Sequence, residues 1–371
     1  MSIKKKMSVE EGLVIDNGSR SLRVGIAGEE TPQLVLRSLI GNLKVQNIMN
    51  RERFFGDELV GRRSEYNLVP VTKHDETNWE KWEELMWHVC SKMNVESSEK
   101  AVLMTEKVMQ SKKHREKMTQ TMFETFSVPA FYSMFQEVAS SFACGNVTSF
   151  VVSSGYEQTY LVPIFEGQVL PHVVKKLKLG GRHATEYLYK MLQQDGIEIP
   201  GEDEFSKLEL VNSIKETLAF SNQYPDYIDL NLTKTFELPD KTKIEIKERH
   251  LANCAHLLFI PSLAESSEDG FSEMLCSSYY KIDIDYRRMF NEKFVMCGGN
   301  TLFQHLPSTL HMNVFNNLPD GLYRVKEASE GVLSSWTGGS IMASLSTFES
   351  NVIHKQEYEE IGPNIIHRKC F

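Results

Sequence analysis

The sequence lacks long apolar runs, closely spaced cysteines and an excess of basic residues, and each absence excludes a class of protein. No stretch approaches the roughly 20 apolar residues that a bilayer-spanning helix needs, so we expect no membrane span. Lysine and arginine total 41 against 50 acidic residues, which gives a net charge of −9. Duplex nucleic acid attracts proteins with a basic excess, so we expect no nucleic-acid partner.

Cysteine and histidine usage excludes two further kinds of site. The sequence has six cysteines and no CxxC pair, which is typical of a reduced cytosolic or nuclear protein whose thiols serve as small apolar side chains. The eleven histidines form no HExxH motif and no His/Cys cluster at zinc-ligand spacing. We therefore expect no structural metal site.

Strand and helix signals alternate along the chain, which favours an α/β fold. A length of 371 residues is large for one hydrophobic core, so two lobes are expected. Two strand–turn–strand segments have a similar pattern and suggest related lobes, with chance likeness as the alternative. Their predicted strands cover residues Leu13–Asp16, Leu22–Gly28, Ser149–Val152 and Thr159–Phe165, and the turns contain Asn17-Gly18-Ser19 and Ser153-Ser154-Gly155.

Apolar residues at helical spacing predict four helices. One charged segment, Ala264–Gly270, is predicted to be an exposed loop. The predicted helices cover Trp79–Lys92, Lys113–Phe126, Gly181–Gln194 and Leu208–Phe220.

Several motifs in order along nearly the whole chain carry a family resemblance. They include Leu13–Gly18, Arg115–Tyr132, Gly298–Thr301, Trp336–Ser340 and Arg368–Phe371. Together they resemble the actin superfamily and identify a divergent actin or actin-related protein. The resemblance implies the actin-like ATPase fold, an α/β fold with two pseudo-related lobes of mixed sheet plus helices around a nucleotide cleft.

The resemblance also implies a division of the chain. The outer lobe would hold residues 1–135 and 335–371, with a small insert at about 38–69. The inner lobe would hold residues 136–334, with an insert at about 180–268. ATP or ADP, with Mg²⁺ or Ca²⁺, would bind between the lobes.

The resemblance transfers site roles to matching positions. Backbone N–H groups at a turn such as Gly18-Ser19-Arg20 can bind phosphate oxygens, which fits the implied role of this loop. Asp16 would hold the ion through water, and Gln136 would position the attacking water. The implied nucleotide contacts are Gly18, Ser19, Arg20, Arg23, Gly155, Lys215, Glu216, Gly298, Gly299 and Asn300.

The chain departs from the family at the second loop. Ser153 replaces an aspartate and Tyr160 replaces a histidine, two residues of the family's ion and water apparatus. Losing one positioned group of this kind often costs about 10²–10³-fold in rate, so we expect weak or lost hydrolysis. The alternative is a shifted loop with surviving hydrolysis. Glu157 replaces a glycine and would either repel phosphate or recruit the cation, and Arg23 replaces a lysine.

Polymer-forming segments differ as well. The loop between Gly41 and Gly56 is shorter than in actins, and the 264–268 tip is charged where actins are more apolar. We therefore expect a divergent actin-like cytoskeletal protein with altered polymerisation that acts through protein partners, either actin-like subunits or actin-binding proteins. The alternatives are a conventional filament-forming ATPase and a non-polymerising actin-related subunit of an assembly. The expected location is the cytoplasm and cytoskeleton, with the nucleus as the alternative.

Overall fold

The computed structural model describes residues 12–44, 54–62, 65–73, 76–221, 232–238, 241–318, 325–327 and 331–370. Two compact units share the chain: unit 1 holds residues 1–146 and 333–371, and unit 2 holds residues 147–332. Unit 1 therefore includes residues 136–146, which the sequence-based division placed in the inner lobe. Most of the shortened loop between Gly41 and Gly56 lies outside the described residues.

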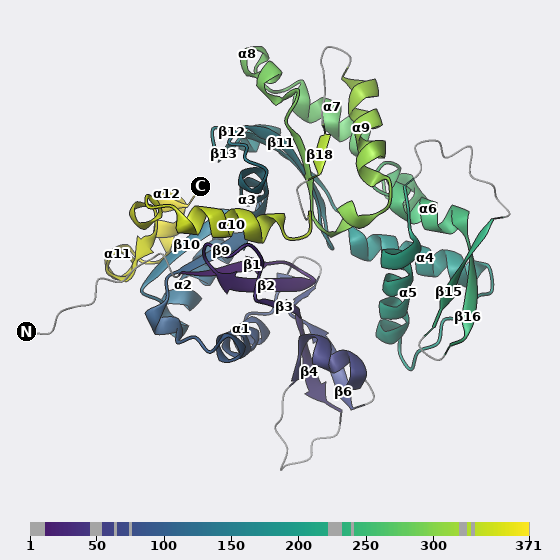
Figure 1. Ribbon diagram of the computed structural model, residues 1–371, viewed down its shortest axis with the longest axis horizontal. Coiled ribbons are helices and arrows are strands. Elements are labelled where there is room, and N and C mark those ends of the chain that lie inside the picture. Colours follow the sequence, from purple (N-terminus) through teal and green to yellow (C-terminus); the bar gives the residue numbers. More distant parts are fainter. Residues whose placement is uncertain are drawn as a thin grey trace, which may run out of the picture. The chain divides into compact units, whose positions relative to one another are not determined.

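Unit 1 is built on a six-stranded mixed sheet (Figure 1). Strand β1 pairs antiparallel with β2 and parallel with β9, and β9 pairs parallel with β10. All five residues of β9 are buried, as expected for a central strand covered on both faces. In sheet order the strands are β19 (Ile353–His354), β10 (Ala130–Phe135), β9 (Val102–Glu106), β1 (Leu13–Asn17), β2 (Ser21–Ile26) and β3 (Leu34–Arg37).

Two helices pack closely together against this sheet, α3 (Gln136–Ala143) and α10 (Ser334–Ser344). A Cβ on Gly338 would lie 1.7 Å from the Ala139 carbonyl oxygen, so only glycine allows this approach. Trp336 donates its indole N–H to Val14 O at 3.2 Å and fixes α10 on β1.

Helix α1 (Trp79–Met93) belongs to the main hydrophobic core of unit 1. The Asn78 side chain accepts a hydrogen bond from Lys81 N and caps the helix at its start. Its apolar face buries Trp82, Leu85, Met86 and Val89.

The rest of unit 1 consists of short elements. Strands β4 (Leu39–Leu43), β5 (Phe54–Phe55) and β6 (Tyr66–Pro70) form a small sheet, and β7 (Thr72–Lys73) pairs with β8 (Glu76–Thr77). The other helical segments are η2 (Gly56–Arg62), η3 (Ser97–Glu99), α2 (Lys112–Gln120), the π-helix η4 (Thr121–Thr125), η10 (Phe348–Ser350), α11 (Lys355–Ile361), η11 (Pro363–Ile365) and α12 (Ile366–Lys369).

Unit 2 repeats the arrangement of the first sheet. Strand β11 pairs antiparallel with β12 through a tight turn and parallel with β17, as β1 pairs with β2 and β9. The sheet order is β13 (Gln168–Val169), β12 (Thr159–Phe165), β11 (Ser149–Ser154), β17 (Phe294–Cys297) and β18 (Val325–Glu327), with β14 (Lys175–Leu177) also paired to β12.

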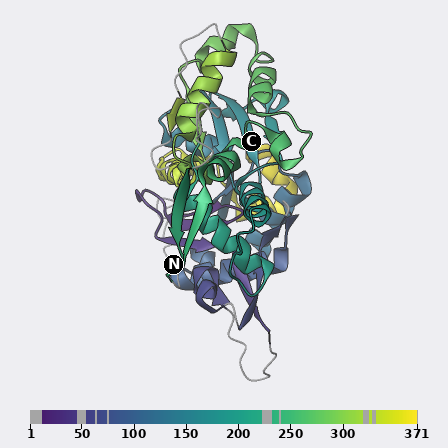
Figure 2. The ribbon, with the colours of Figure 1, turned by 90° about the vertical axis from the view of Figure 1, so that its right-hand side faces the viewer.

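Helices and a two-stranded ribbon complete unit 2. The ribbon of β15 (Thr233–Glu237) and β16 (Lys243–Lys247) is drawn in green in Figure 2. Helices α4 and α5 pack together, and each also packs on α6. The helical segments are η5 (Pro171–Val173), α4 (Gly181–Gln194), α5 (Glu204–Leu218), α6 (Glu248–His256), η7 (Pro261–Ala264), α7 (Phe271–Tyr279), α8 (Ile284–Arg287), η8 (Arg288–Phe290), η9 (Gly299–Leu302) and α9 (Leu306–Asn317).

The α/β class expected from the sequence is confirmed, and the predicted helices differ from the observed ones mainly at their ends. Helix α4 has the predicted bounds. The predicted helix over Lys113–Phe126 is α2 followed by the π-helix η4. Helix α5 begins at Glu204, four residues before the predicted start, because the Asp203 side chain accepts a hydrogen bond from Ser206 N.

No helix in the described part of the chain combines the length and apolar character needed to cross a bilayer.

Candidate functional site

The first predicted loop is organised around a buried carboxylate. Asp16, at 1% exposed, stands near the end of β1. Its Oδ1 accepts hydrogen bonds from Thr105 Oγ1 at 2.6 Å and from Gln136 Nε2 at 3.0 Å. Thr105 is the register neighbour of Asp16 on the parallel strand β9, so the sheet itself brings these two side chains together.

Arg23 binds the other oxygen of the same carboxylate. Its Nη1 lies 2.8 Å from Asp16 Oδ2, and the two side chains are 13% and 2% exposed. Arg23 is directly opposite Asp16 in the antiparallel β1–β2 pairing, where side chains share one face of the sheet. Both oxygens of Asp16 are therefore bound by groups of the chain itself.

Gln136 begins α3 and points its amide nitrogen at this loop. Besides Asp16, Nε2 lies 3.4 Å from Asn17 O and 3.5 Å from Thr105 Oγ1. The structure thus brings together Asp16, Arg23 and Gln136. The sequence assigned Asp16 to the ion, Arg23 to a phosphate contact and Gln136 to the attacking water. In the structure the Gln136 amide N–H groups donate to Asp16 and Asn17.

The turn after β1 requires glycine at its start. A Cβ on Gly18 would lie 2.5 Å from Ser21 O and 3.8 Å from Arg23 Nη1. Ser38 fixes the turn, since its Oγ donates to Gly18 O and its N donates to Arg20 O. Ser19, within this turn, is only partly buried.

The second predicted loop, between β11 and β12, is held by a buried polar network. Gly155 N donates to Gln158 O at 2.9 Å and closes the turn. Asn300 Nδ2 donates to Ser154 Oγ at 2.9 Å and to Gly155 O at 3.1 Å. Asn300 and Gly155, assigned to one site from the sequence, are therefore in contact.

Ser153 and Tyr160 stand where the family resemblance implies an acid and a histidine. They are register partners in the β11–β12 pairing. Tyr160 is 4% exposed and its hydroxyl hydrogen-bonds Gln158 Oε1, while the Lys176 ammonium lies 5.7 Å from its ring centroid. Neither residue offers a carboxylate or an imidazole at this loop.

Glu157 forms an ion pair with Arg182, a residue that was not predicted from the sequence to belong to the site. Both Glu157 oxygens accept from Arg182 Nε, at 3.2 and 3.1 Å, and Glu157 is 5% exposed. Arg182 also donates Nη1 to Glu186 Oε1 at 2.7 Å. The sequence analysis predicted that Glu157 would either repel phosphate or recruit a cation. In the structure Arg182 neutralises the charge of Glu157 instead.

The same arginine affects its neighbour His183. Burial is the main cause that lowers the pKa of His183, and the Arg182 charge lowers it further. The His183 ring nitrogens face Gly180 N and Arg182 Nη2, at 3.2 and 3.0 Å. These two contacts hold His183 within the start of α4, and Arg182 connects that start to Glu157 of the second loop.

Lys215 is buried, not solvated, although it stands on a helix. Its Nζ donates to Gly181 O at 2.8 Å and Thr185 Oγ1 at 3.0 Å. The next residue, Glu216, accepts from Asn212 Nδ2 at 2.7 Å. Lys215 is therefore held against the start of α4, beside Asn300, whose Oδ1 lies 2.9 Å from a Cβ built on Gly181.

Gly298 and Gly299, which follow β17, differ in whether the backbone could accommodate a side chain. Gly298 has φ +93°, and a Cβ there would lie 2.3 Å from Ser154 O. A Cβ on Gly299 meets no described atom within 4 Å. Gly298 is required by the backbone, whereas Gly299 leaves space that a bound ligand can use.

Asp16 of the first loop and Ser153 of the second are poor ligands for the implied divalent ion. Mg²⁺ and Ca²⁺ bind oxygen ligands, chiefly carboxylates. The Asp16 carboxylate already accepts hydrogen bonds from Thr105 and Gln136 and forms an ion pair with Arg23. Ser153 carries no charge. Within the described ranges, no group of three or more His, Cys, Asp or Glu side chains is arranged to hold a metal. Neither loop, taken by itself, presents a donor set that fits the implied ion.

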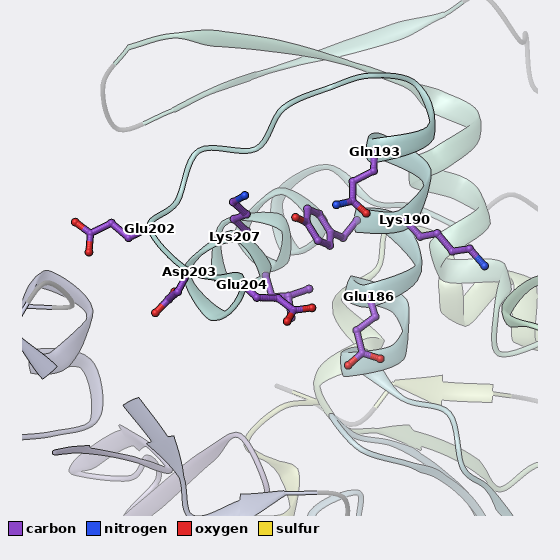
Figure 3. A pocket seen from close by; sticks show the side chains of 9 residues that line it. Glu186, Lys190, Gln193, Glu202, Asp203, Glu204 and Lys207 are labelled. Carbon is purple, nitrogen blue, oxygen red and sulfur yellow. The ribbon is translucent and has the colours of Figure 1, made fainter. Parts of the chain in front are cut away.

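A separate surface groove of about 590 Å³ lies between α4 and α5 (Figure 3). Its labelled acidic side chains include Glu186 on α4 and Glu202 before α5. None of the predicted contact residues lines it. Glu186 bonds Arg182 and so connects the rim of the groove to the second loop.

Sequence reasoning missed Thr105 and Arg182. The apolar run that precedes Thr105 was a usable signal, because it predicts a buried strand, and parallel neighbouring strands end at one edge of a sheet. Arg182 carried no such signal, because only the packing of α4 on the second loop brings it to Glu157.

Comparison with known proteins identifies relatives of the whole chain. The sequence model of the family described as Actin matches residues 8–371. A curated relative described as "Putative actin-29", from Dictyostelium discoideum, is 34% identical over 379 residues and covers 97% of each chain.

Proposed function

Because the chain belongs to the actin family, we propose that it binds ATP or ADP as a structural ligand, hydrolyses it weakly or not at all, and acts in the cytoskeleton through protein partners. The observation that carries the proposal is the closed environment of Asp16, whose two oxygens are bound by Thr105, Gln136 and Arg23.

Three features support nucleotide binding. Gly299 provides backbone that a ligand can approach, and Lys215 and Asn300 lie near it at the start of α4. In unit 1, the Arg23 guanidinium lies 3.8 Å from a Cβ built on Gly18, so a group that suits phosphate lies against the glycine turn. A ligand bound only to the folded state stabilises it by mass action, which is the structural role proposed here.

One feature supports weak hydrolysis. Hydrolysis needs a polarised and oriented water, and Ser153 and Tyr160 offer neither a carboxylate nor an imidazole to polarise it. Ser153 supplies no charge where the family has a carboxylate. The expected deficit for one lost group is about 10²–10³-fold in turnover.

The test combines nucleotide identification with turnover. Mass spectrometry of the purified chain identifies retained ATP or ADP, and phosphate release measures hydrolysis with Mg²⁺ present. The variant Ser153→Asp restores the carboxylate and is expected to raise phosphate release. Ser267→Asp, an exposed serine in the 264–270 loop, is the matched control and should leave it unchanged. Absence of any nucleotide and of any ATP binding by the chain would refute the proposal.

One observation favours a second candidate, a non-polymerising subunit of an assembly. The charged loop at Ala264–Gly270 is bound to its own unit, since Glu265 lies 2.5 Å from Lys190 Nζ and Glu268 accepts from Lys178 N at 2.8 Å. Charged groups are depleted in interface cores. Sedimentation with Mg²⁺ and salt separates the candidates, because a filament former pellets, whereas a subunit stays in the supernatant and elutes from extract in a discrete heavy complex.

A further inference from the structure

We propose that this chain binds its nucleotide without a divalent cation, with the Arg23 guanidinium supplying the positive charge that an ion would otherwise provide. The inference rests on the proposed nucleotide binding and deepens it. The ligand class is then a nucleoside di- or triphosphate taken as the free anion, not as its metal chelate.

Groups of unit 1 already use three of the roughly four acceptor sites of Asp16, the carboxylate of the first loop. Asp16 carries the charge at this loop, and its Oδ1 accepts from Thr105 and Gln136 while its Oδ2 binds Arg23. A cation at this carboxylate would have to displace the guanidinium, which already lies at 2.8 Å, or stand beside it against like charge. Since the pair is mostly buried, water screens that repulsion poorly.

The second loop offers no substitute ligand. Ser153 is an alcohol, and the acid nearest to it along the loop, Glu157, is 5% exposed with both oxygens on Arg182 Nε. Each loop therefore has its carboxylate neutralised by an arginine from its own unit. Two independent pairs, Asp16–Arg23 and Glu157–Arg182, lead to the same conclusion.

Arg23 lies where a phosphate-binding charge is needed. Its Nη1 is 3.8 Å from the position of a Cβ on Gly18, so the guanidinium lies against the turn predicted to bind phosphate. A guanidinium has five N–H donors, and the bond to Asp16 uses one of them. The planar fork matches phosphate geometry, and arginine remains charged at every working pH.

The decisive experiment measures ATP affinity by equilibrium dialysis, once with excess Mg²⁺ and once with excess EDTA. We expect ATP to bind at least as tightly in EDTA as with Mg²⁺, because excess Mg²⁺ converts ATP into the chelate and removes the free anion that the site takes. Binding at least about tenfold weaker in EDTA would overturn the inference while leaving nucleotide binding intact. No binding in either buffer would refute the proposed function as well.

A variant assigns the effect to Arg23. Arg23→Gln keeps a polar side chain but removes the charge, so its affinity in EDTA should fall by at least about tenfold and recover partly with Mg²⁺. Arg288→Gln, at an exposed arginine of unit 2, is the matched control and should bind as the wild type does. A folded Arg23→Gln protein with unchanged affinity in EDTA would overturn the assignment. If this variant does not fold, the wild-type comparison of the two buffers still decides the inference.

Discussion

Asp16 and Arg23 stand directly opposite each other across the β1–β2 pairing, with Arg23 Nη1 2.8 Å from Asp16 Oδ2. The sequence assigned Arg23 to a phosphate contact and Asp16 to an ion, and the structure joins the two side chains in an ion pair. The register of β1 and β2 therefore determines the charge state around the first loop.

Arg23→Gln should destabilise unit 1. Removing one partner of a buried ion pair leaves an uncompensated charge, which costs about 3 kcal/mol of unfolding free energy. Asp16→Asn combined with Arg23→Gln should recover part of this loss, because no unpaired charge remains. Urea unfolding of the wild type and the three variants gives the coupling free energy of the pair. Additive losses would show that the two groups do not interact.

Gly298→Ala and Gly299→Ala should behave differently although the glycines are adjacent. Alanine at Gly298 must adopt φ +93° and place its Cβ 2.3 Å from Ser154 O, so we expect a loss of at least about 2 kcal/mol in unfolding free energy. Alanine at Gly299 meets open space and should change stability by less than about 1 kcal/mol.

Gly299 is also one of the proposed nucleotide contacts. The added methyl group at Gly299 should weaken ATP binding while the fold is retained, which equilibrium dialysis measures directly. Equal affinity in the Gly299→Ala variant would remove Gly299 from the proposed nucleotide contacts.

Asp195, which follows α4, should make the stability of unit 2 sensitive to acid. Hydrogen bonds from Lys247 and then His250 are the leading causes that lower the pKa of Asp195 to about 2, from an ordinary value of 3.8. A carboxyl with a lowered pKa stabilises the fold above pH 3.8, and this contribution is lost as the pH falls towards 2.

The pH dependence of Asp195→Asn provides the check. The variant should be less stable than wild type at neutral pH by at most about 1 kcal/mol, because solvent reaches the ion pair. The difference should vanish near pH 2. Asp269→Asn, at an exposed aspartate, should show no such difference at either pH. A difference that persists at the acid end would contradict the assignment.

Thiol labelling should divide the six cysteines by burial. Burial raises the pKa of Cys254 and of Cys370 to about 12, and both side chains are 0% exposed. Thiolate is the reactive form, so both should resist iodoacetamide at pH 8 in the folded protein. Cys90, Cys144 and Cys276 are partly exposed and should react first. Peptide mapping by mass spectrometry after timed labelling gives the order, and rapid labelling of Cys370 would contradict its burial.

The main elements could be predicted from the sequence because their signals are local. The glycine turn after β1, the apolar face of α1 and the bounds of α4 follow from periodicity and turn chemistry, which neighbouring residues determine. The early start of α5 was missed because the cap at Asp203 lies within an acidic run that also suits a loop.

The pairing of charges across the fold was decided by the tertiary structure. The sequence by itself established an α/β chain of the actin family with an alcohol at position 153 and a glutamate at position 157. Strand register brought Arg23 and Thr105 into contact with Asp16. The packing of α4 on the second loop brought Arg182 into contact with Glu157. Such partners are distant in sequence, and a charge is stabilised by whichever group the folded backbone brings within hydrogen-bonding distance.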